Sequence, residues 1–296
     1  MAEQADAADL KPVQRMHVAS RKSTAQGGVL SNVLSNFFES RREGLSLNTR
    51  DFYEGYLRRA GAVIGFNVTS HDINQFIKAL PCSNGGKHAY FRVLKTFYNW
   101  FYSPKAGYGL KLSDNPILGV DAPKQGKKIL PSLTLEQVDY IIDQAGRVRD
   151  KAIVSLFNDS GLRLEELTNI NPQDIDWNRR LIKVRGKGNK EGYALFGERT
   201  AALLKEWLEQ RPADSSLWHI GSYTIADMLE KLSAKTGITF SAHTFRRTFA
   251  SILAKRGVDS LHIMRLGRWE SIAMVERYTR SVRFEDSMKF YAAIVN

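Results

Sequence analysis

The chain has 296 residues, of which 43% are hydrophobic and 25% charged, and its formal net charge at pH 7 is +12. At about 150 residues per domain, this length predicts two domains that can each bury a core. Such an excess of positive charge is typical of proteins that bind a polyanion, with nucleic acid as the first candidate. The single cysteine, Cys82, excludes a disulfide within the chain and a zinc site built from several thiolates.

The same features favour a cytoplasmic, nucleoid-associated protein. A lone cysteine fits a reducing compartment, and no apolar run approaches the roughly 18 residues of a membrane span. Residues 1–9 are rich in alanine and acidic side chains, which is unlike a signal peptide. We therefore expect no membrane partner.

A linker is predicted over residues 119–131 (GVDAPKQGKKILP), which combine glycine, proline and lysine without helical or strand periodicity. Residues 1–128 carry 18 basic and 10 acidic side chains, and residues 129–296 carry 25 and 21, so the smaller part is the more basic. We expect three further regions: a flexible tail over 1–24, a helical domain over 25–118 and a second domain over 132–296.

The first domain is predicted to be a bundle of four or five helices, because its apolar residues recur at helical spacing. These helices are expected over 29–38, from Ser46, after Ser70 and over 87–102. Aromatic residues such as Tyr90 and Phe97 keep the helical period, so we expect them to pack in a core and not to stack on bases.

The second domain is predicted to be mainly helical with a small β-hairpin, which makes the whole chain an α-rich two-domain protein. A capping box at Thr134 and Gln137 predicts the start of its first helix. Two strands, over 181–185 and 193–196, are expected to form a hairpin around the turn 186–189. Further helices are expected over 150–158, 200–210, 224–236 and 243–255.

Four groups of residues are candidates for chemistry. His243 and Arg246 are three apart and share one face of a helix start, where anions are favoured; a solvated basic helix start is the alternative. Arg163 follows a glycine break, with Glu166 one turn later to orient it; a surface ion pair is the alternative.

Lys187 occupies the tip of the predicted hairpin, where a lysine also serves turn solubility. Tyr278 has basic neighbours and lies nine residues beyond Trp269, in a setting where a tyrosine is usually half-buried packing. Each of these signals is weak by itself, and their combination is more specific.

Taken in order, Arg163, Lys187, His243-x-x-Arg246, Trp269 and Tyr278 resemble the motif of the tyrosine recombinase, or phage integrase, family. The sequence segments around these residues are similar to the family's too: SGLRLEEL, VRGKGNK, HTFRRTFASILAKRGVD and RYTR. Upstream, SLNTRDFY and RVLKTFYNWF look like the family's helical core-binding domain, so the resemblance extends from about residue 25 to the end.

The chain departs from the family pattern in two places. Arg247 stands where the family commonly has histidine, and LGRW replaces the usual LGH, with one residue inserted before Trp269. Tryptophan can still donate through its indole N–H. We also expect the chain to lack the additional arm-binding domain of some phage integrases.

The resemblance implies cleavage of DNA strands through a covalent 3′-phosphotyrosyl intermediate and a Holliday junction, without metal, ATP or other cofactor. It assigns Arg163 and Arg246 to the phosphate oxygens, His243 and Trp269 to further donors, Lys187 to the leaving oxygen and Tyr278 to the nucleophile. Glu166 would hold Arg163.

The implied partners are double-stranded DNA with a specific site and three further copies of the chain. Thr49, Arg50, Lys87 and Arg92 lie on the two helices that resemble the family's groove-facing pair. The apolar tail over 281–296 would dock on a neighbouring protomer or on its own domain.

Other functions stay open at this point. A type IB topoisomerase shares the cleavage chemistry but acts alone, a DNA-binding regulator would have a silent site, and a structural basic protein would need no such polar set.

Overall fold

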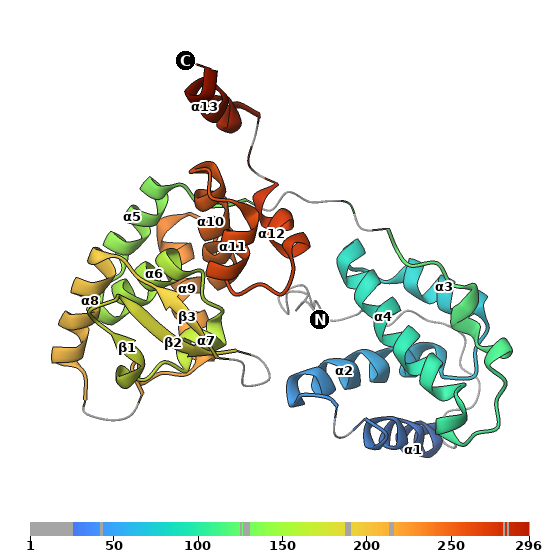
Figure 1. Cartoon of the computed structure of the whole chain (residues 1–296). Coiled ribbons are helices and arrows are strands. Elements are labelled where there is room, and N and C mark those ends of the chain that lie inside the picture. Colours follow the sequence, from blue (N-terminus) through green and yellow to red (C-terminus); the bar gives the residue numbers. More distant parts are fainter. Residues whose placement is uncertain are drawn as a thin grey trace. The chain divides into compact units, whose positions relative to one another are not determined.

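The computed structural model describes residues 26–41, 44–124, 126, 131–186, 191–212, 216–280, 282 and 284–295, without the side chains of 26–31, 289 and 291–295. The chain divides into two compact units, Met1–Lys127 and Lys128–Asn296. The described part is mostly helical with one small antiparallel sheet (Figure 1), which confirms the predicted fold class. The predicted tail over 1–24 lies outside the described residues.

The described part of the first unit contains four α-helices: α1 (Gln26–Glu39), α2 (Leu47–Ile64), α3 (Ser70–Ala79) and α4 (Asn84–Phe101). Side chains of Ser46, Thr69 and Ser83 accept hydrogen bonds from backbone N–H groups in the first turns of α2, α3 and α4, which satisfies donors that a helix start leaves unpaired. Three 3₁₀ turns follow them: η2 (Pro104–Ala106), η3 (Leu112–Asp114) and η4 (Pro116–Gly119).

The core of this unit is aromatic. Phe37, Phe97 and Tyr98 are fully buried, and the ring of Phe97 lies 5.5 Å from that of Phe37, edge to face. Burial raises the pKa of the Tyr98 phenol well above its ordinary value. These contacts confirm that the helical repeat of aromatic residues marks a core.

The second unit places a three-stranded antiparallel sheet, in the order β1-β2-β3, beside its helices. The strands are β1 (Ile175–Asp176), β2 (Leu181–Arg185) and β3 (Glu191–Leu195). Buried Ile182 pairs with Ala194 on one side and Ile175 on the other, so one face of the sheet faces the core. The hairpin was predicted; β1 was not, because a two-residue strand has no periodicity to read.

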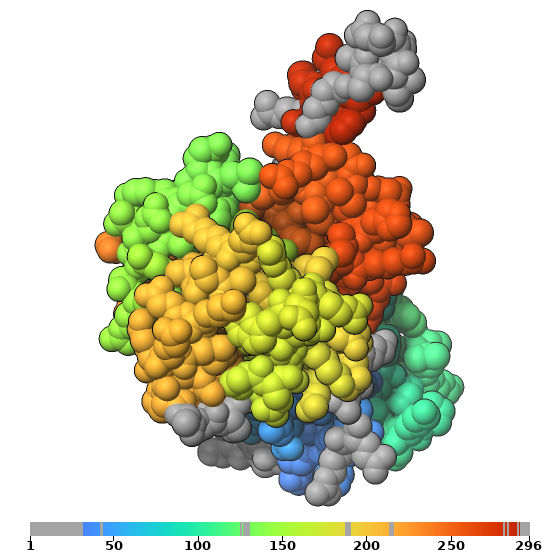
Figure 2. All heavy atoms as spheres, turned by 60° about the vertical axis from the view of Figure 1, so that its left-hand side comes forward, coloured from blue at the N-terminus to red at the C-terminus, as the bar shows by residue number. Residues whose placement is uncertain are grey.

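The helices of this unit are α5 (Leu135–Gln144), α6 (Val148–Ser160), α7 (Leu164–Thr168), α8 (Glu198–Gln210), α9 (Ser222–Thr236), α10 (Ala242–Lys255), α11 (Ser260–Leu266), α12 (Ile272–Thr279) and α13 (Phe284–Val295). The capping box of α5 at Thr134 and Gln137 is present as predicted. Figure 2 shows one face, on which the green surface of α5 adjoins the amber to orange surface of α8 and α9 and the orange-red surface of α10 to α12.

Helix α6 forms the centre of the second unit. Six of its residues from Ala152 to Phe157 are buried, so almost every side of this helix is covered. The ring of Phe157 stacks on that of Phe245 in α10, with centroids 6.0 Å apart. This contact fixes α10, and the residues it carries, against the end of α6.

Helix α13 contacts the end of α10 within the same chain. Lys255 Nζ lies 4.0 Å from Asp286 Oδ2, and a Cβ atom on Gly257 would come within 2.6 Å of the Phe290 ring. Phe284 and Met288 are exposed. Among the described residues, no helix has both the length and the apolar character that crossing a bilayer requires.

Gly161, which ends α6, has a left-handed φ of +57°, and a Cβ atom there would lie 2.7 Å from the Phe249 ring. We expect Gly161→Ala to lower the free energy of unfolding by about 1 kcal/mol for the backbone and about 1–3 kcal/mol more for overpacking. Gly237 has a φ of +69°, and a Cβ atom there would meet nothing within 4 Å, so Gly237→Ala should show the backbone cost alone. Urea denaturation measures both, and equal losses would contradict the packing argument.

Candidate active site

Arg163 stands at the start of α7, directly after the turn that Gly161 makes possible. Its Nη1 lies 2.5 Å from Glu166 Oε1, and its backbone N–H donates to Glu166 Oε2 at 3.0 Å. Glu166 therefore closes the first turn of α7 and holds the guanidinium at once. The Arg163 side chain remains 36% exposed, so it can still meet a ligand.

Glu166 itself is buried, with 3% of its surface exposed. Burial by itself would raise the pKa of its carboxyl group, but the charges of Arg268 and Arg163 and the hydrogen bonds from Arg163 outweigh it. The pKa is therefore below its ordinary value, and Glu166 is a carboxylate at neutral pH. The alternative considered from the sequence was an ion pair between Arg163 and Glu166 on the surface. The burial of Glu166 argues against this alternative.

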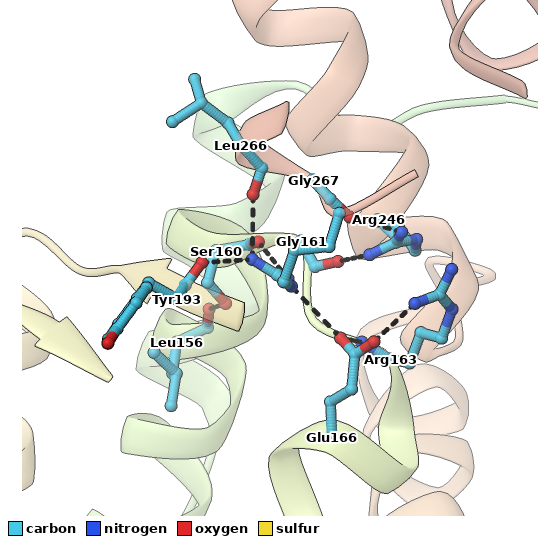
Figure 3. A network of polar contacts seen from close by, with 10 residues as sticks. Leu156, Ser160, Gly161, Arg163, Glu166, Tyr193, Arg246, Leu266 and Gly267 are labelled. Carbon is cyan, nitrogen blue, oxygen red and sulfur yellow. Dashed lines mark hydrogen bonds and ion pairs between the residues drawn. The ribbon is translucent and has the colours of Figure 1, made fainter. Parts of the chain in front are cut away.

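Arg246, on α10, is almost fully buried. Its Nη1 donates to the carbonyl of Gly161 and its Nη2 to that of Gly267 at 2.5 Å (Figure 3). Each terminal nitrogen carries a second N–H, so these bonds orient the guanidinium without using all its donors. Burial and the neighbouring charge of Arg163 lower the pKa of Arg246 to about 9, which leaves it protonated at neutral pH.

Trp269 connects Arg246 to Tyr278. The Arg246 Cζ atom lies over the indole, 4.3 Å from the ring centroid, and the Tyr278 ring lies 5.5 Å away on α12. Gly267 makes room for the indole, because a Cβ atom there would overlap the ring. The buried Trp269 Nε1 has no hydrogen-bond partner among the described residues. Leaving a buried donor unpaired costs about 1–3 kcal/mol, so this atom is suited to an incoming acceptor.

His243 and Arg246 lie on one helix, as predicted, but at different depths. His243 is exposed in the first turn of α10, whereas Arg246 points into the interior. The alternative of a solvated basic helix start therefore does not fit Arg246, because its side chain is buried. Lys187 lies outside the described residues, between the ends of β2 and β3.

Arg268 is a member of this cluster that the sequence reasoning missed. Its Nε lies 3.5 Å from Glu166 Oε2, opposite the contact with Arg163, and its side chain is only 13% exposed. Burial lowers the pKa of its guanidinium, which the carboxylate of Glu166 partly offsets. The signal in the sequence was LGRW itself, in which Arg268 is the residue inserted before Trp269.

Three of the four candidate DNA-contact residues make contacts within the first unit itself. Thr49 contributes to the N-cap of α2, and Arg50 lies over the Phe38 ring at 5.5 Å. Lys87, near the start of α4, donates from Nζ to the carbonyl of Lys78 at 2.8 Å. Arg92, in the middle of α4, is half-buried, and its Nε lacks a hydrogen-bond partner within the described part of the chain.

The described part of the second unit thus brings three guanidinium groups, one carboxylate, an indole N–H and a phenol together. Such a set is suited to a phosphate group, because guanidinium forks and neutral N–H donors bind its oxygens while the excess of positive charge balances its own. Within the ranges described above, no three His, Cys, Asp or Glu side chains gather in a way that could hold a metal ion.

The lowered pKa of Glu166 predicts a pH-dependent contribution to stability. This contribution should be fully present above the ordinary glutamate value of 4.5 and lost as the pH falls through the lower value of the folded state. We expect the stability difference between the native chain and Glu166→Gln to shrink below that pH in urea denaturation. Glu165→Gln, at an exposed neighbour on the same helix, should show no such trend; a constant difference for Glu166→Gln would contradict the prediction.

Known proteins are similar to this chain in sequence and in fold. The family model described as the phage integrase family matches residues 131–283, which include every candidate residue of the second unit. Tyrosine recombinase XerA of Saccharolobus solfataricus is 29% identical over 219 residues, covering 73% of this chain and 75% of the relative. Tyrosine recombinase XerC of Mannheimia succiniciproducens is 30% identical over 185 residues, but that alignment spans only 57% of this chain and 63% of the relative.

A solved structure shares the fold. The Tn1549 transposon integrase, in complex with circular intermediate DNA, superposes with a TM-score of 0.69 at 16% identity, over 88% of this chain and 98% of that chain. At such low identity the likeness concerns the fold alone. The family model covers more than half of the chain, and the chain therefore belongs to the phage integrase family and is a tyrosine-type site-specific recombinase.

Proposed function

We propose that this protein cleaves and rejoins strands of double-stranded DNA at a specific site, through a covalent 3′-phosphotyrosyl link to Tyr278. The observation that carries the proposal is the contact of the Trp269 ring with both Arg246 and Tyr278, which brings a phenol near a buried cation and near an indole N–H without a partner among the described residues. The proposal also draws on the family membership and on the DNA named with the Tn1549 integrase structure.

In the proposed step, the Tyr278 oxygen attacks the phosphorus and the bond to the 5′ oxygen breaks. The phenol gives its proton to His243, and the leaving oxygen takes one from Lys187, so a free 5′-hydroxyl is released. An ammonium can give up a proton while a guanidinium essentially cannot, which favours Lys187 over the arginines as the acid. The roles of Lys187 and His243 rest on the resemblance to the family.

Attack increases the negative charge on the non-bridging oxygens, and the arginines counter it. Arg163 presents a partly exposed guanidinium held by Glu166, and Arg246 contributes a buried charge held by two carbonyls. Because both groups are oriented before DNA arrives, little reorganisation opposes the reaction. The covalent link conserves the energy of the phosphodiester bond, so a second 5′-hydroxyl can attack it and complete the exchange.

We further propose that α2 and α4 of the first unit contact the duplex through Thr49, Arg50, Lys87 and Arg92. Exchange between two duplexes requires four active chains on a Holliday junction, so we propose a homotetramer on DNA. The exposed apolar residues of α13, such as Phe284 and Met288, are suited to a contact between such protomers.

The nucleophile is tested with a DNA substrate nicked near the cleavage position, so that the released fragment diffuses away. We expect the native chain to form a protein–DNA adduct that survives denaturation and Tyr278→Phe to form none, since only the hydroxyl is removed. Tyr193→Phe, at an exposed ring on β3, is the matched control and should form the adduct normally. An adduct with Tyr278→Phe would show that another residue is the nucleophile.

The donor role of Trp269 predicts a separate result. Trp269→Phe keeps an aromatic ring between Arg246 and Tyr278 but lacks the N–H, so the rate of adduct formation at saturating DNA should fall by about 10²–10³-fold. Trp269→His restores a ring N–H and should recover part of the rate. Equal rates for Trp269→Phe and the native chain would show that the indole N–H does not contact the reacting phosphate.

A further inference from the structure

Arg268 joins several segments of the fold. Its Nη1 donates to the carbonyls of Tyr193 at 3.1 Å and Leu266 at 2.9 Å, and its Nη2 to that of Ser160 at 3.1 Å. Its Nε faces Glu166. The guanidinium thus joins its own turn at the end of α11 to two regions that are distant in the sequence, β3 and the segment from the end of α6 to the first turn of α7.

Arg268 and Arg246 bind the same two turns. At the end of α6, the carbonyl of Ser160 accepts from Arg268 and the next carbonyl, of Gly161, accepts from Arg246. At the end of α11, the carbonyl of Leu266 accepts from Arg268 and the next, of Gly267, accepts from Arg246 (Figure 3). The position of either guanidinium therefore depends on the other.

Arg268 and Arg163 share Glu166. One carboxylate oxygen lies 2.5 Å from Arg163 Nη1 and the other 3.5 Å from Arg268 Nε. A carboxylate paired on both sides cannot rotate away from Arg163. Arg268 is thus connected to one candidate phosphate-binding arginine through a carboxylate and to the other through two turns.

The backbone around Arg268 is adapted to this position. Arg268 has a φ of +56°, a conformation that side-chain-bearing residues rarely adopt. On β3, Gly192 leaves room for the side chain, because a Cβ atom there would lie 3.0 Å from the Arg268 Cδ atom. A disfavoured backbone conformation persists only where the surroundings hold it, and here the side-chain contacts do so.

We propose that Arg268 is a positioning residue for the phosphate site: it fixes Arg163 and Arg246 relative to each other by joining Glu166 to the two turns that hold Arg246. Arg268 does not touch the DNA. This inference rests on the proposed cleavage reaction. It also explains why arginine is needed, since a planar fork reaches three carbonyls and a carboxylate, whereas a lysine places its charge on one nitrogen.

The test compares Arg268→Met, Arg268→Lys and, as a matched control, Arg265→Met, at an exposed arginine one turn earlier on α11. Adduct formation on the nicked substrate is measured against protein concentration, which separates the rate from DNA affinity. We expect Arg268→Met to react about 10²-fold more slowly at saturation with unchanged affinity, Arg268→Lys to fall between, and Arg265→Met to match the native chain. An unchanged rate at saturation for Arg268→Met would overturn the proposal.

A pH series separates positioning from a general loss of structure. The charged groups around Glu166 are Arg163 on α7, Arg246 on α10 and Arg268 after α11, with Tyr278 on α12 acting on Arg246. Without Arg268, the buried carboxyl should take up a proton more readily, so the rate of Arg268→Met should fall further on acidification than the native rate does. Parallel pH profiles would show that Arg268 does not act through Glu166.

Urea denaturation of Arg268→Met, Glu166→Gln and the double variant gives a readout that needs no reaction. Coupled residues should show a combined loss of stability clearly smaller than the sum of the single losses, and additive losses would contradict the pairing. If Arg268→Met does not fold, Arg268→Lys replaces it in both experiments. If the native chain forms no adduct, the proposed reaction fails, and the denaturation cycle alone then decides whether Arg268 positions Glu166.

Discussion

The carboxylate of Glu166 between the guanidinium groups of Arg163 and Arg268 is the interaction on which the geometry of the site depends. A buried carboxylate without partners would be protonated, and a buried guanidinium without partners would be strongly destabilising. When the groups are paired, each charge lowers the free-energy cost of burying the other. Because there are three guanidinium groups and a single carboxylate in the cluster, positive charge is left over for an anionic ligand.

Backbone carbonyls also orient the guanidinium groups of the site, in addition to the carboxylate of Glu166. Arg246 and Arg268 take four carbonyls from two turns, one after α6 and one at the end of α11. These turns need glycine for different reasons: Gly161 for its left-handed backbone, and Gly267 for the close approach of the Trp269 ring. The backbone conformation of Gly161 and the missing side chain of Gly267 therefore determine where Arg246, Arg268 and the Trp269 indole lie. The indole in turn positions the Tyr278 ring.

The first unit combines an aromatic core with basic side chains that lie outside that core. Its helices pack around aromatic rings such as those of Phe37 and Phe97, and its net positive charge stays outside that core. Even so, part of the charge is used within the unit: Lys87 binds a carbonyl and Arg50 lies over an aromatic ring. Basic side chains held in this way keep their charge for a polyanion while losing fewer conformations when they meet it.

Much of this could be predicted from the sequence. Helical periodicity located the main helices and the aromatic core, and the turn residues located the β2–β3 hairpin. The ordered motif named Arg163, His243, Arg246, Trp269 and Tyr278 as candidates. The short elements β1, α11 and α12 were not predicted, because two to eight residues are too few to establish a period.

What the sequence by itself determined was which segments are helical and which residue types are available for chemistry, since both depend on neighbours along the chain. Only the tertiary structure decided that Arg246 is buried while His243 is exposed, that the Trp269 Nε1 has no partner in the described part of the chain, and that Arg268 belongs to the site. Among the bonds that hold these arginines, those from Arg268 to Tyr193 and to Ser160 join residues 75 and 108 positions apart. No local pattern carries such contacts, because they form only when distant elements pack together.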